Sequence, residues 1–83
     1  MPEVEVHLWS SLRRLTGGAE VVTVEAETIG TMLDALLAAY PGLEPVFDAG
    51  ISVAVNGEIY NGARHHPIGA SDEIYLMQRL KGG

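Results

Sequence analysis

The sequence contains no cysteine. This absence excludes a disulfide framework, a thiolate metal site and a cysteine nucleophile, and it suits the reducing cytosol, so we expect a cytoplasmic protein. No run of about 18 apolar residues occurs, so no membrane-spanning segment is predicted. The first five residues lack the basic and apolar regions of a signal peptide.

Basic residues are also few. Five lysines and arginines face eleven aspartates and glutamates, which gives a net charge of −6. Nucleic acids and anionic membranes require a basic surface, so neither is predicted as a partner, whereas a protein with a basic surface is favoured. The 83 residues are 47% hydrophobic and 19% charged, which indicates one folded domain with a modest core.

Two strands are predicted near the beginning of the chain. Residues 3–9 alternate with a period of two, with Val4, Val6 and Leu8 on one side. Residues 10–15 form a polar and basic connection, and residues 19–26 alternate again after a glycine turn. The pattern predicts a hairpin with a wide connection.

One helix is predicted with a defined beginning and end. Thr28 is a good N-cap, and Pro41-Gly42 stops the helix. Gly30 costs about 1 kcal/mol relative to alanine if it is helical. The segment is amphipathic because its large apolar residues recur at intervals of three and four. They are Ile29, Met32, Leu33, Leu36, Leu37 and Tyr40.

The second half of the chain predicts three further strands. Residues 43–50 are irregular or hold one short turn, and residues 51–55 alternate as a third strand. Asn56-Gly57 is a strong hairpin turn signal, after which residues 58–60 form a short edge strand. Residues 73–80 form the closing strand.

This element order predicts an α+β protein of the β-grasp type. The single helix crosses one face of a mixed sheet of four to five strands, because both apolar surfaces must be buried. The closing strand lies parallel to the first at the centre of the sheet. We expect a domain over residues 1–80 and a flexible tail over residues 81–83.

The tail is the predicted functional element. Gly82 and Gly83 carry no Cβ atom, so a thread of this kind can enter a channel that bulkier residues would block. Its terminal carboxylate could then be activated there. Terminal residues are often simply disordered, so the two glycines alone are a weak signal.

Other candidate sites are weaker still. His65 and His66 are adjacent, cannot easily ligate one ion, and are interpreted as a solvated loop, so no metal site is predicted. The Ser10-Ser11 pair lacks a nucleophile-elbow context. The Arg13-Arg14 pair is too small a basic patch for nucleic acid. No phosphate-binding glycine motif occurs, and we expect neither a bound cofactor nor catalysis by this chain.

The whole chain resembles the ubiquitin-like sulfur-carrier family, which includes the molybdopterin synthase small subunit and the thiazole-synthesis sulfur carrier. Five pieces carry the resemblance in the family's order. They are residues 6–17 (VHLWSSLRRLTG), the capped helix of residues 28–43, residues 52–58 (SVAVNGE), His66-Pro67-Ile68 with Ser71-Asp72-Glu73-Ile74, and Gly82-Gly83. Gln78-Arg79 and Ser71 depart from the family pattern, and residues 80–83 resemble the tail of ubiquitin.

The resemblance implies a carrier, not an enzyme. An adenylating enzyme of the ubiquitin-activating type would use ATP to adenylate Gly83, and a sulfur donor protein would convert it to a thiocarboxylate. The resemblance favours molybdopterin synthesis, with a larger synthase subunit as acceptor. Thiazole, cysteine and tRNA thiolation remain open, as do a modifier joined to lysines and a plain β-grasp interaction module.

A docking face is also predicted. Tyr75, Met77 and Arg79 share one side of the closing strand, and His7 and Trp9 share one side of the first strand. If these strands are neighbours, the residues form a partly apolar patch near the tail. Leu80 belongs to the same predicted docking set, and Lys81 and Gly82 continue from it to Gly83. The alternative is that Trp9 and Met77 pack under a loop.

Overall fold

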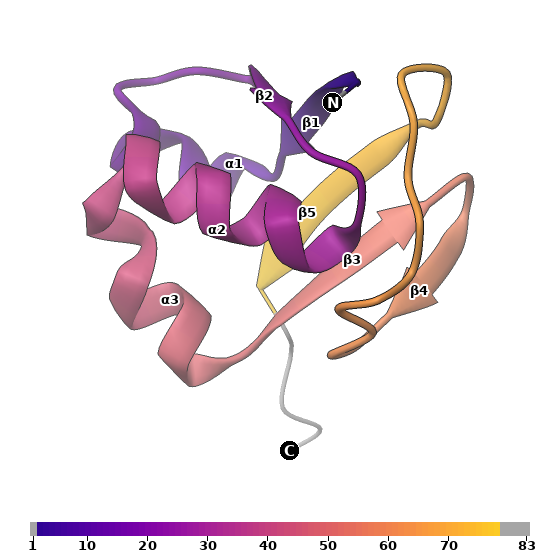
Figure 1. Cartoon of the computed structure of the whole chain (residues 1–83). Helices are drawn as coiled ribbons and strands as arrows, with labels where there is room; N and C mark the ends of the chain where they lie inside the picture. The colour runs from indigo at the N-terminus through magenta and orange to yellow at the C-terminus, as the bar shows by residue number, and fades with distance from the viewer. Residues whose placement is uncertain (1, 79–83) are drawn as a thin grey trace.

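The computed structural model describes residues 2–78 (Figure 1). Within these residues the strands are β1 (Glu3–Leu8), β2 (Val21–Glu25), β3 (Ile51–Val55), β4 (Glu58–Tyr60) and β5 (Ile74–Gln78). The helical segments are α1 (Ser10–Arg13), η1 (Arg14–Thr16), α2 (Ile29–Ala39), η2 (Pro41–Leu43) and α3 (Glu44–Ala49). None of these helices is long and apolar enough to cross a bilayer.

The strands of the described region form one mixed sheet in the order β2-β1-β5-β3-β4. β1 and β5 are parallel, with Val6 opposite Ile74 and Leu8 opposite Leu76. The other neighbours, β1–β2, β3–β5 and β3–β4, are antiparallel. The predicted β-grasp arrangement is therefore confirmed, with the closing strand at the centre of the sheet.

The core lies between the sheet and α2, which crosses one face of the sheet (Figure 1). The alternating apolar residues of the central strands point into this layer and are almost completely buried. Their helical partners are Ile29, Met32 and Leu36, each at most 2% exposed. The apolar residues that recur every second position in the strands thus pack against those that recur every 3.6 residues in the helix, and together they form one apolar layer. The strand residues are Val4, Val6, Leu8, Val53, Val55, Ile74 and Leu76.

The beginning of α2 is closed by its own threonines. The Thr31 N–H donates to Thr28 Oγ1 at 3.2 Å, and the Thr28 N–H donates to Thr31 Oγ1 at 3.0 Å. These two hydrogen bonds form a reciprocal capping box, and they confirm Thr28 as the predicted N-cap. The helix ends at Ala39, immediately before Tyr40 and Pro41, as the sequence predicts.

Gly30 permits a close approach of the 61–69 loop to α2. The Gly30 N–H donates to the Arg64 carbonyl at 2.9 Å, and the Ile29 N–H donates to the His66 carbonyl at 3.0 Å. A Cβ atom at position 30 would lie 3.0 Å from both Cβ and the carbonyl oxygen of Arg64. The glycine that weakens the helix locally is therefore needed to bring the loop against its first turn.

Two segments differ from the sequence prediction. Residues 10–15, expected as a connection, are helical in α1 and η1, and residues 43–50, expected as irregular or one turn, contain α3. In both segments buried apolar side chains, Leu12 in α1 and Leu43 and Val46 around α3, hold the chain against the core. Burial of these anchors favours helical turns that the short sequence patterns do not show.

The entry to β5 is held by Asp72 and Asn56. Asp72 accepts from the Asn56 side chain at 3.0 Å and from the Gly69 N–H at 2.8 Å. Asn56 also accepts from the Glu73 N–H at 2.9 Å. These hydrogen bonds, that from Asn56 first, lower the pKa of the Asp72 carboxyl below its ordinary value of 3.8. The β3–β4 turn is thereby fastened to the start of the central strand.

We predict that Gly30→Ala destabilises the protein. Alanine adds about 1 kcal/mol of helix propensity, but crowding against Arg64 costs about 1–3 kcal/mol in a packed site. Urea unfolding should therefore show a net loss. Ala38→Gly, at an exposed position of α2, measures the propensity contribution alone. A Gly30→Ala protein more stable than the parent would contradict the prediction, because it would show that the loop moves away from the added methyl group at little cost.

We also predict a pH dependence that originates at Asp72. Because its folded-state pKa is lowered, its ionised form stabilises the protein above the unfolded pKa, and this contribution is lost as the pH falls through the folded pKa. Asp72→Asn should lower the unfolding free energy at neutral pH and flatten its fall below about pH 4. Asp48→Asn, which removes an exposed charge from α3, is the matched control. Parallel acid curves for the parent and Asp72→Asn would contradict this assignment.

Candidate functional site

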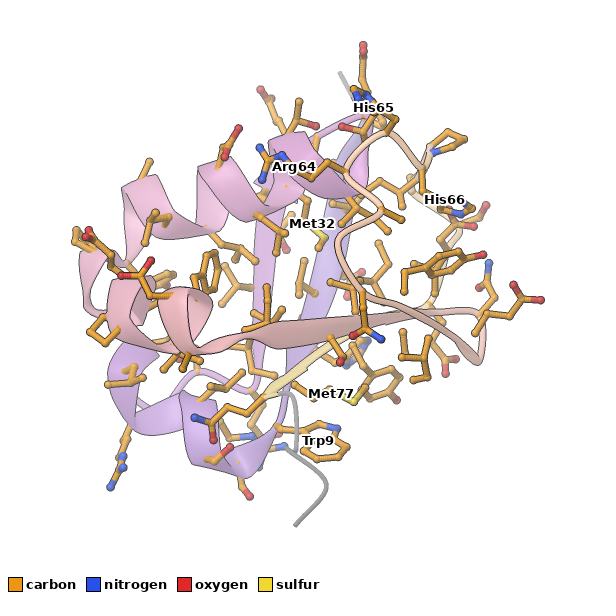
Figure 2. All side chains as sticks on the ribbon, turned by 90° about the horizontal axis from the view of Figure 1, so that it is seen from below. Trp9, Met32, Arg64, His65, His66 and Met77 are labelled. Carbon is orange, nitrogen blue, oxygen red and sulfur yellow. The ribbon has the colours of Figure 1, made fainter. Side chains whose placement is uncertain are left out.

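One face of the sheet is not covered by α2. Figure 2 shows Trp9 and Met77 on the side of the sheet opposite Met32, which belongs to the buried face of α2. Strand alternation assigns further residues to this open face, because neighbours in register share a side. The open face is the candidate site because it is where the predicted docking residues are found.

A row of five side chains crosses the open face from edge to edge. The register pairs Val21 with His7, His7 with Tyr75, Tyr75 with Ala54 and Ala54 with Ile59. Four strand spacings make this row about 19 Å long. At its centre the rings of His7 and Tyr75 stack with centroids 4.8 Å apart. We call these five residues the transverse row.

A second group lies next to the transverse row, at the end where β1 and β5 finish. The Trp9 N–H donates to the Leu76 carbonyl at 3.2 Å, which holds Trp9 beside β5. Met77, the next residue of β5, is half-buried and lies opposite Ser52. Ser52 is buried and its hydroxyl donates to the Asn61 side chain. This end of the face is therefore apolar, and its one buried polar side chain, Ser52, has a hydrogen-bond partner.

The large apolar side chains that the described region exposes all lie on or beside this face. Trp9 is 42% exposed, Val21 40%, Ile59 56% and Tyr75 36%. Four such residues gathered on one surface, while the opposite face of the sheet is packed under α2, are typical of an interaction site. Trp, Tyr and Ile also provide large contact areas on binding.

The structure places the predicted docking residues only in part. His7, Trp9, Tyr75 and Met77 lie together as expected for neighbouring strands, and Trp9 is exposed rather than packed under a loop. Val21 and Ile59 were not predicted, although the Asn56-Gly57 turn would have set the register that brings Ile59 opposite Ala54. The other predicted site residues lie outside the described residues. They are Arg79, Leu80, Lys81, Gly82 and Gly83.

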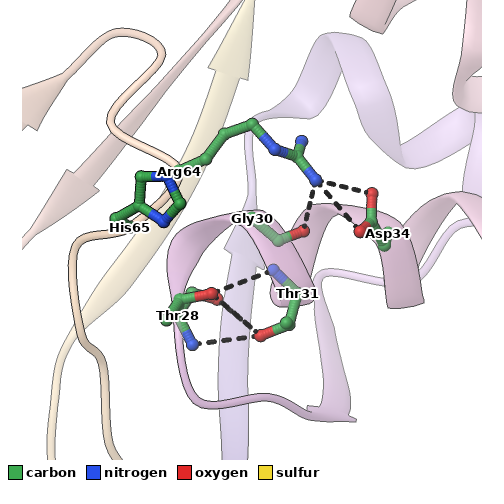
Figure 3. Close-up of a pocket in the computed structure, with 6 residues that line it drawn as sticks. All are labelled: Thr28, Gly30, Thr31, Asp34, Arg64 and His65. Atoms are coloured by element: carbon green, nitrogen blue, oxygen red, sulfur yellow. Dashed lines mark hydrogen bonds and ion pairs between the residues drawn. The ribbon is translucent and has the colours of Figure 1, made fainter.

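A separate shallow pocket of about 180 Å³ lies at the beginning of α2 (Figure 3). Its two charged groups are paired: Arg64 Nη2 donates to both carboxylate oxygens of Asp34 at 3.0 Å, and it also donates to the Gly30 carbonyl at 3.4 Å. The first amides of the helix are bonded to the 61–69 loop and to Thr28. This pocket is therefore accounted for by the helix–loop contact, and its arginine is already paired with a carboxylate.

The two adjacent histidines are separated by their surroundings. The His66 ring stacks on Tyr60 with centroids 4.2 Å apart, whereas His65 lines the α2 pocket. Within residues 2–78 no three His, Asp or Glu side chains are grouped as a metal site would require. Of the surfaces considered, the open face therefore remains the candidate interaction site.

Comparisons with known proteins relate the whole chain to one group. The model of the ThiS family matches residues 6–83. The crystal structure of SAMP1 from Haloferax volcanii is 33% identical, with a TM-score of 0.76 over 98% of this chain and 99% of that chain. Comparison with curated protein sequences gives no match.

Two solved complexes contain chains of the same fold. The Amycolatopsis orientalis BexX/CysO complex includes a chain that is 24% identical, with a TM-score of 0.76 over 96% of this chain and 99% of that chain. The complex of subunits 1 and 2 of the molybdopterin-converting factor from Helicobacter pylori includes one that is 22% identical, with a TM-score of 0.66 over 98% and 99%.

Proposed function

Because the chain belongs to the ThiS family of ubiquitin-like sulfur carriers, we propose that a partner enzyme adenylates its Gly83 carboxylate and that the product becomes a thiocarboxylate. The observation that carries this proposal is the family match, which extends through Gly82 to Gly83. The chain acts as substrate and carrier, and the catalytic groups belong to its partners.

The chemistry requires an activated carboxylate. An oxygen of the Gly83 carboxylate attacks the α-phosphorus of ATP, and pyrophosphate leaves. The outer sulfur of a donor-protein persulfide then attacks the carbonyl carbon of the acyl-adenylate, the C–O bond breaks and AMP leaves. A second thiol then attacks the inner sulfur of the resulting acyl disulfide, so that the S–S bond breaks, the thiocarboxylate is released and a disulfide forms on the donor side. Since the adenylate hydrolyses easily, the step needs a water-poor pocket. Lys81 to Gly83 in an extended form would span about 10 Å, enough to cross the lip of such a pocket.

Molybdopterin synthesis is the favoured destination of the sulfur. The resemblance of residues 6–17 to the molybdopterin synthase small subunit supports it, as does the shared fold with a chain of the H. pylori molybdopterin-converting factor complex. A larger synthase subunit would then accept the sulfur from Gly83. Thiazole, cysteine and tRNA thiolation are the alternative destinations that the family resemblance leaves open.

We predict a mass change at Gly83. Incubation of the full chain with ATP, an adenylating enzyme of the ubiquitin-activating type and a sulfur donor should raise its intact mass by the difference between one sulfur and one oxygen atom. Deleting Gly83, or adding a residue after it, should abolish this gain because the activated carboxylate is lost or displaced.

The comparison with Ala38→Ser, on the exposed side of α2, controls for handling of the protein. Fragmentation should localise the sulfur to Gly83. An unchanged mass for the parent chain, under conditions where the enzyme activates another carrier, would contradict the carrier function and favour a plain interaction module.

A protein modifier is the second candidate function. The similarity to a structure that is named as a small archaeal modifier protein, at 30% identity, favours it. In that case Gly83 would form an amide with a lysine of another protein, and the assay would give larger adducts. Lys81 is the sequence's one lysine, so Lys81→Arg distinguishes linkage between copies of this chain from linkage to other proteins.

The open face is the proposed docking surface for the adenylating enzyme. Its exposed apolar residues lie on both sides of β5, the strand that leads in sequence toward the tail. Binding there would hold the body of the carrier while Gly83 enters the partner. The transverse row supplies contact area at Val21, Tyr75 and Ile59.

We predict that Ile59→Thr and Val21→Thr weaken activation without unfolding the protein. Both changes keep a β-branched side chain on an exposed strand position but make it polar. The KM of the carrier in the adenylation assay should rise about tenfold for Ile59→Thr, as expected for losing the burial of an apolar side chain. Melting curves should change little, and Ala38→Ser should leave KM unchanged. Equal KM values for all variants would place docking on another surface.

A further inference from the structure

Three carboxylates gather at one end of the open face. Glu3 lies directly opposite Glu25 on the neighbouring strand, and Glu5 lies opposite Thr23. All three glutamates are exposed and alternate with the buried residues of β1 and β2, so they share the side of the sheet that carries the transverse row. We call Glu3, Glu5 and Glu25 the acidic end.

The acidic end borders the transverse row directly. Residues two apart on a strand share a side and lie about 7 Å apart, so Glu5 is about 7 Å from His7 along β1 and Glu3 is about 14 Å from His7. Trp9 lies beyond the other end of the same strand. The open face is therefore polarised along β1, with carboxylates at the beginning, an apolar row in the middle and Trp9 at the end.

This arrangement is unfavourable in the free protein. Like charges directly opposite each other on neighbouring strands destabilise a sheet. In the described part of the chain the ion pairs join Arg13 to Glu20 and Arg64 to Asp34, and neither involves the acidic end. A local cost of this kind is typical of a functional surface.

We infer that the partner that binds the open face presents lysine or arginine side chains to Glu3, Glu5 and Glu25, beside an apolar surface that covers the transverse row. The inference rests on the proposed function, since the partner meant is the adenylating enzyme. The charges set the orientation: only one alignment puts the partner's basic side chains on the acidic end and its apolar surface on Ile59, Tyr75 and Val21.

The occupant follows from charge complementarity. A second copy of this chain, with its net charge of −6, would bring further carboxylates to the same surface, and a nucleic acid would bring phosphates. A basic protein surface both relieves the Glu3–Glu25 repulsion and attracts the carrier over about 10 Å at 0.1 M salt. Such steering acts mainly on the rate of association.

The test compares two double charge reversals that have the same net charge. Glu5→Lys with Glu25→Lys alters the open face, and Glu44→Lys with Asp48→Lys alters α3, which lies on the helical side of the molecule (Figure 1). Each pair adds four charge units and takes the net charge from −6 to −2. The adenylating enzyme is assayed with the full chain at low and high salt.

We expect kcat/KM to fall about tenfold or more for the open-face pair at low salt, and within about twofold for the α3 pair. The difference should shrink as salt rises. The open-face pair should melt no lower than the parent, because lysine at position 25 faces Glu3. A protein that is equally stable but activated more slowly separates a docking role from a folding defect.

Equal losses in the two pairs, or no loss in either, would overturn the inference while leaving the carrier function intact, because the parent chain would still gain sulfur at Gly83. A loss that persists unchanged at high salt would also overturn it, since it would not be electrostatic. Failure of the parent chain to be activated at all would overturn the proposed function, and this inference with it.

Discussion

The parallel pairing of β1 with β5 is the constraint on which the rest of the structure depends. It joins the two ends of the described chain at the centre of the sheet, with Val6 against Ile74 and His7 against Tyr75. A parallel pair requires a long crossover connection, and α2 with the residues around it covers one face as a result. The same register that buries Ile74 and Leu76 under the helix must turn Tyr75 and Met77 to the open face.

The crossover is held in place by backbone contacts more than by charge. The 61–69 loop supplies carbonyls to the first amides of α2, and Gly30 lets the two backbones come close. The Arg64–Asp34 ion pair over this contact is exposed, so it adds little to stability. At the end of β3, hydrogen bonds between Asn56 and residues 72–73 fasten the β3–β4 turn to the start of β5. The first contact fixes α2 against the 61–69 loop, and the second fixes the start of the central strand against the β3–β4 turn.

A packed core that fixes the strands suits the proposed carrier function. In the proposed function, the Gly83 carboxylate would reach a partner's pocket while the folded domain stays outside, so the affinity would come from the surface of the domain. The open face supplies apolar area in the transverse row and charge in the acidic end, on strands whose positions the core determines. Interactions placed on strands are held more precisely than those placed on loops.

The sequence by itself determined the elements with strong local signals. The period of two in β1, the Thr28 cap with its apolar stripe and the Asn56-Gly57 turn each act over a few residues, and together they predicted the β-grasp order. The short helices α1 and α3 could not be predicted, because their helical form depends on burying Leu12, Leu43 and Val46 against distant strands.

Only the tertiary structure decided how the open face is composed. Val21 and Ile59 belong to opposite edges of the sheet, and nothing local to either residue shows that both lie in one row with Tyr75. The facing of Glu3 and Glu25 is likewise a matter of register between strands. Local patterns determine which side of a strand is apolar, whereas pairing between strands determines which residues become neighbours, because hydrogen-bonded register is a property of two segments at once.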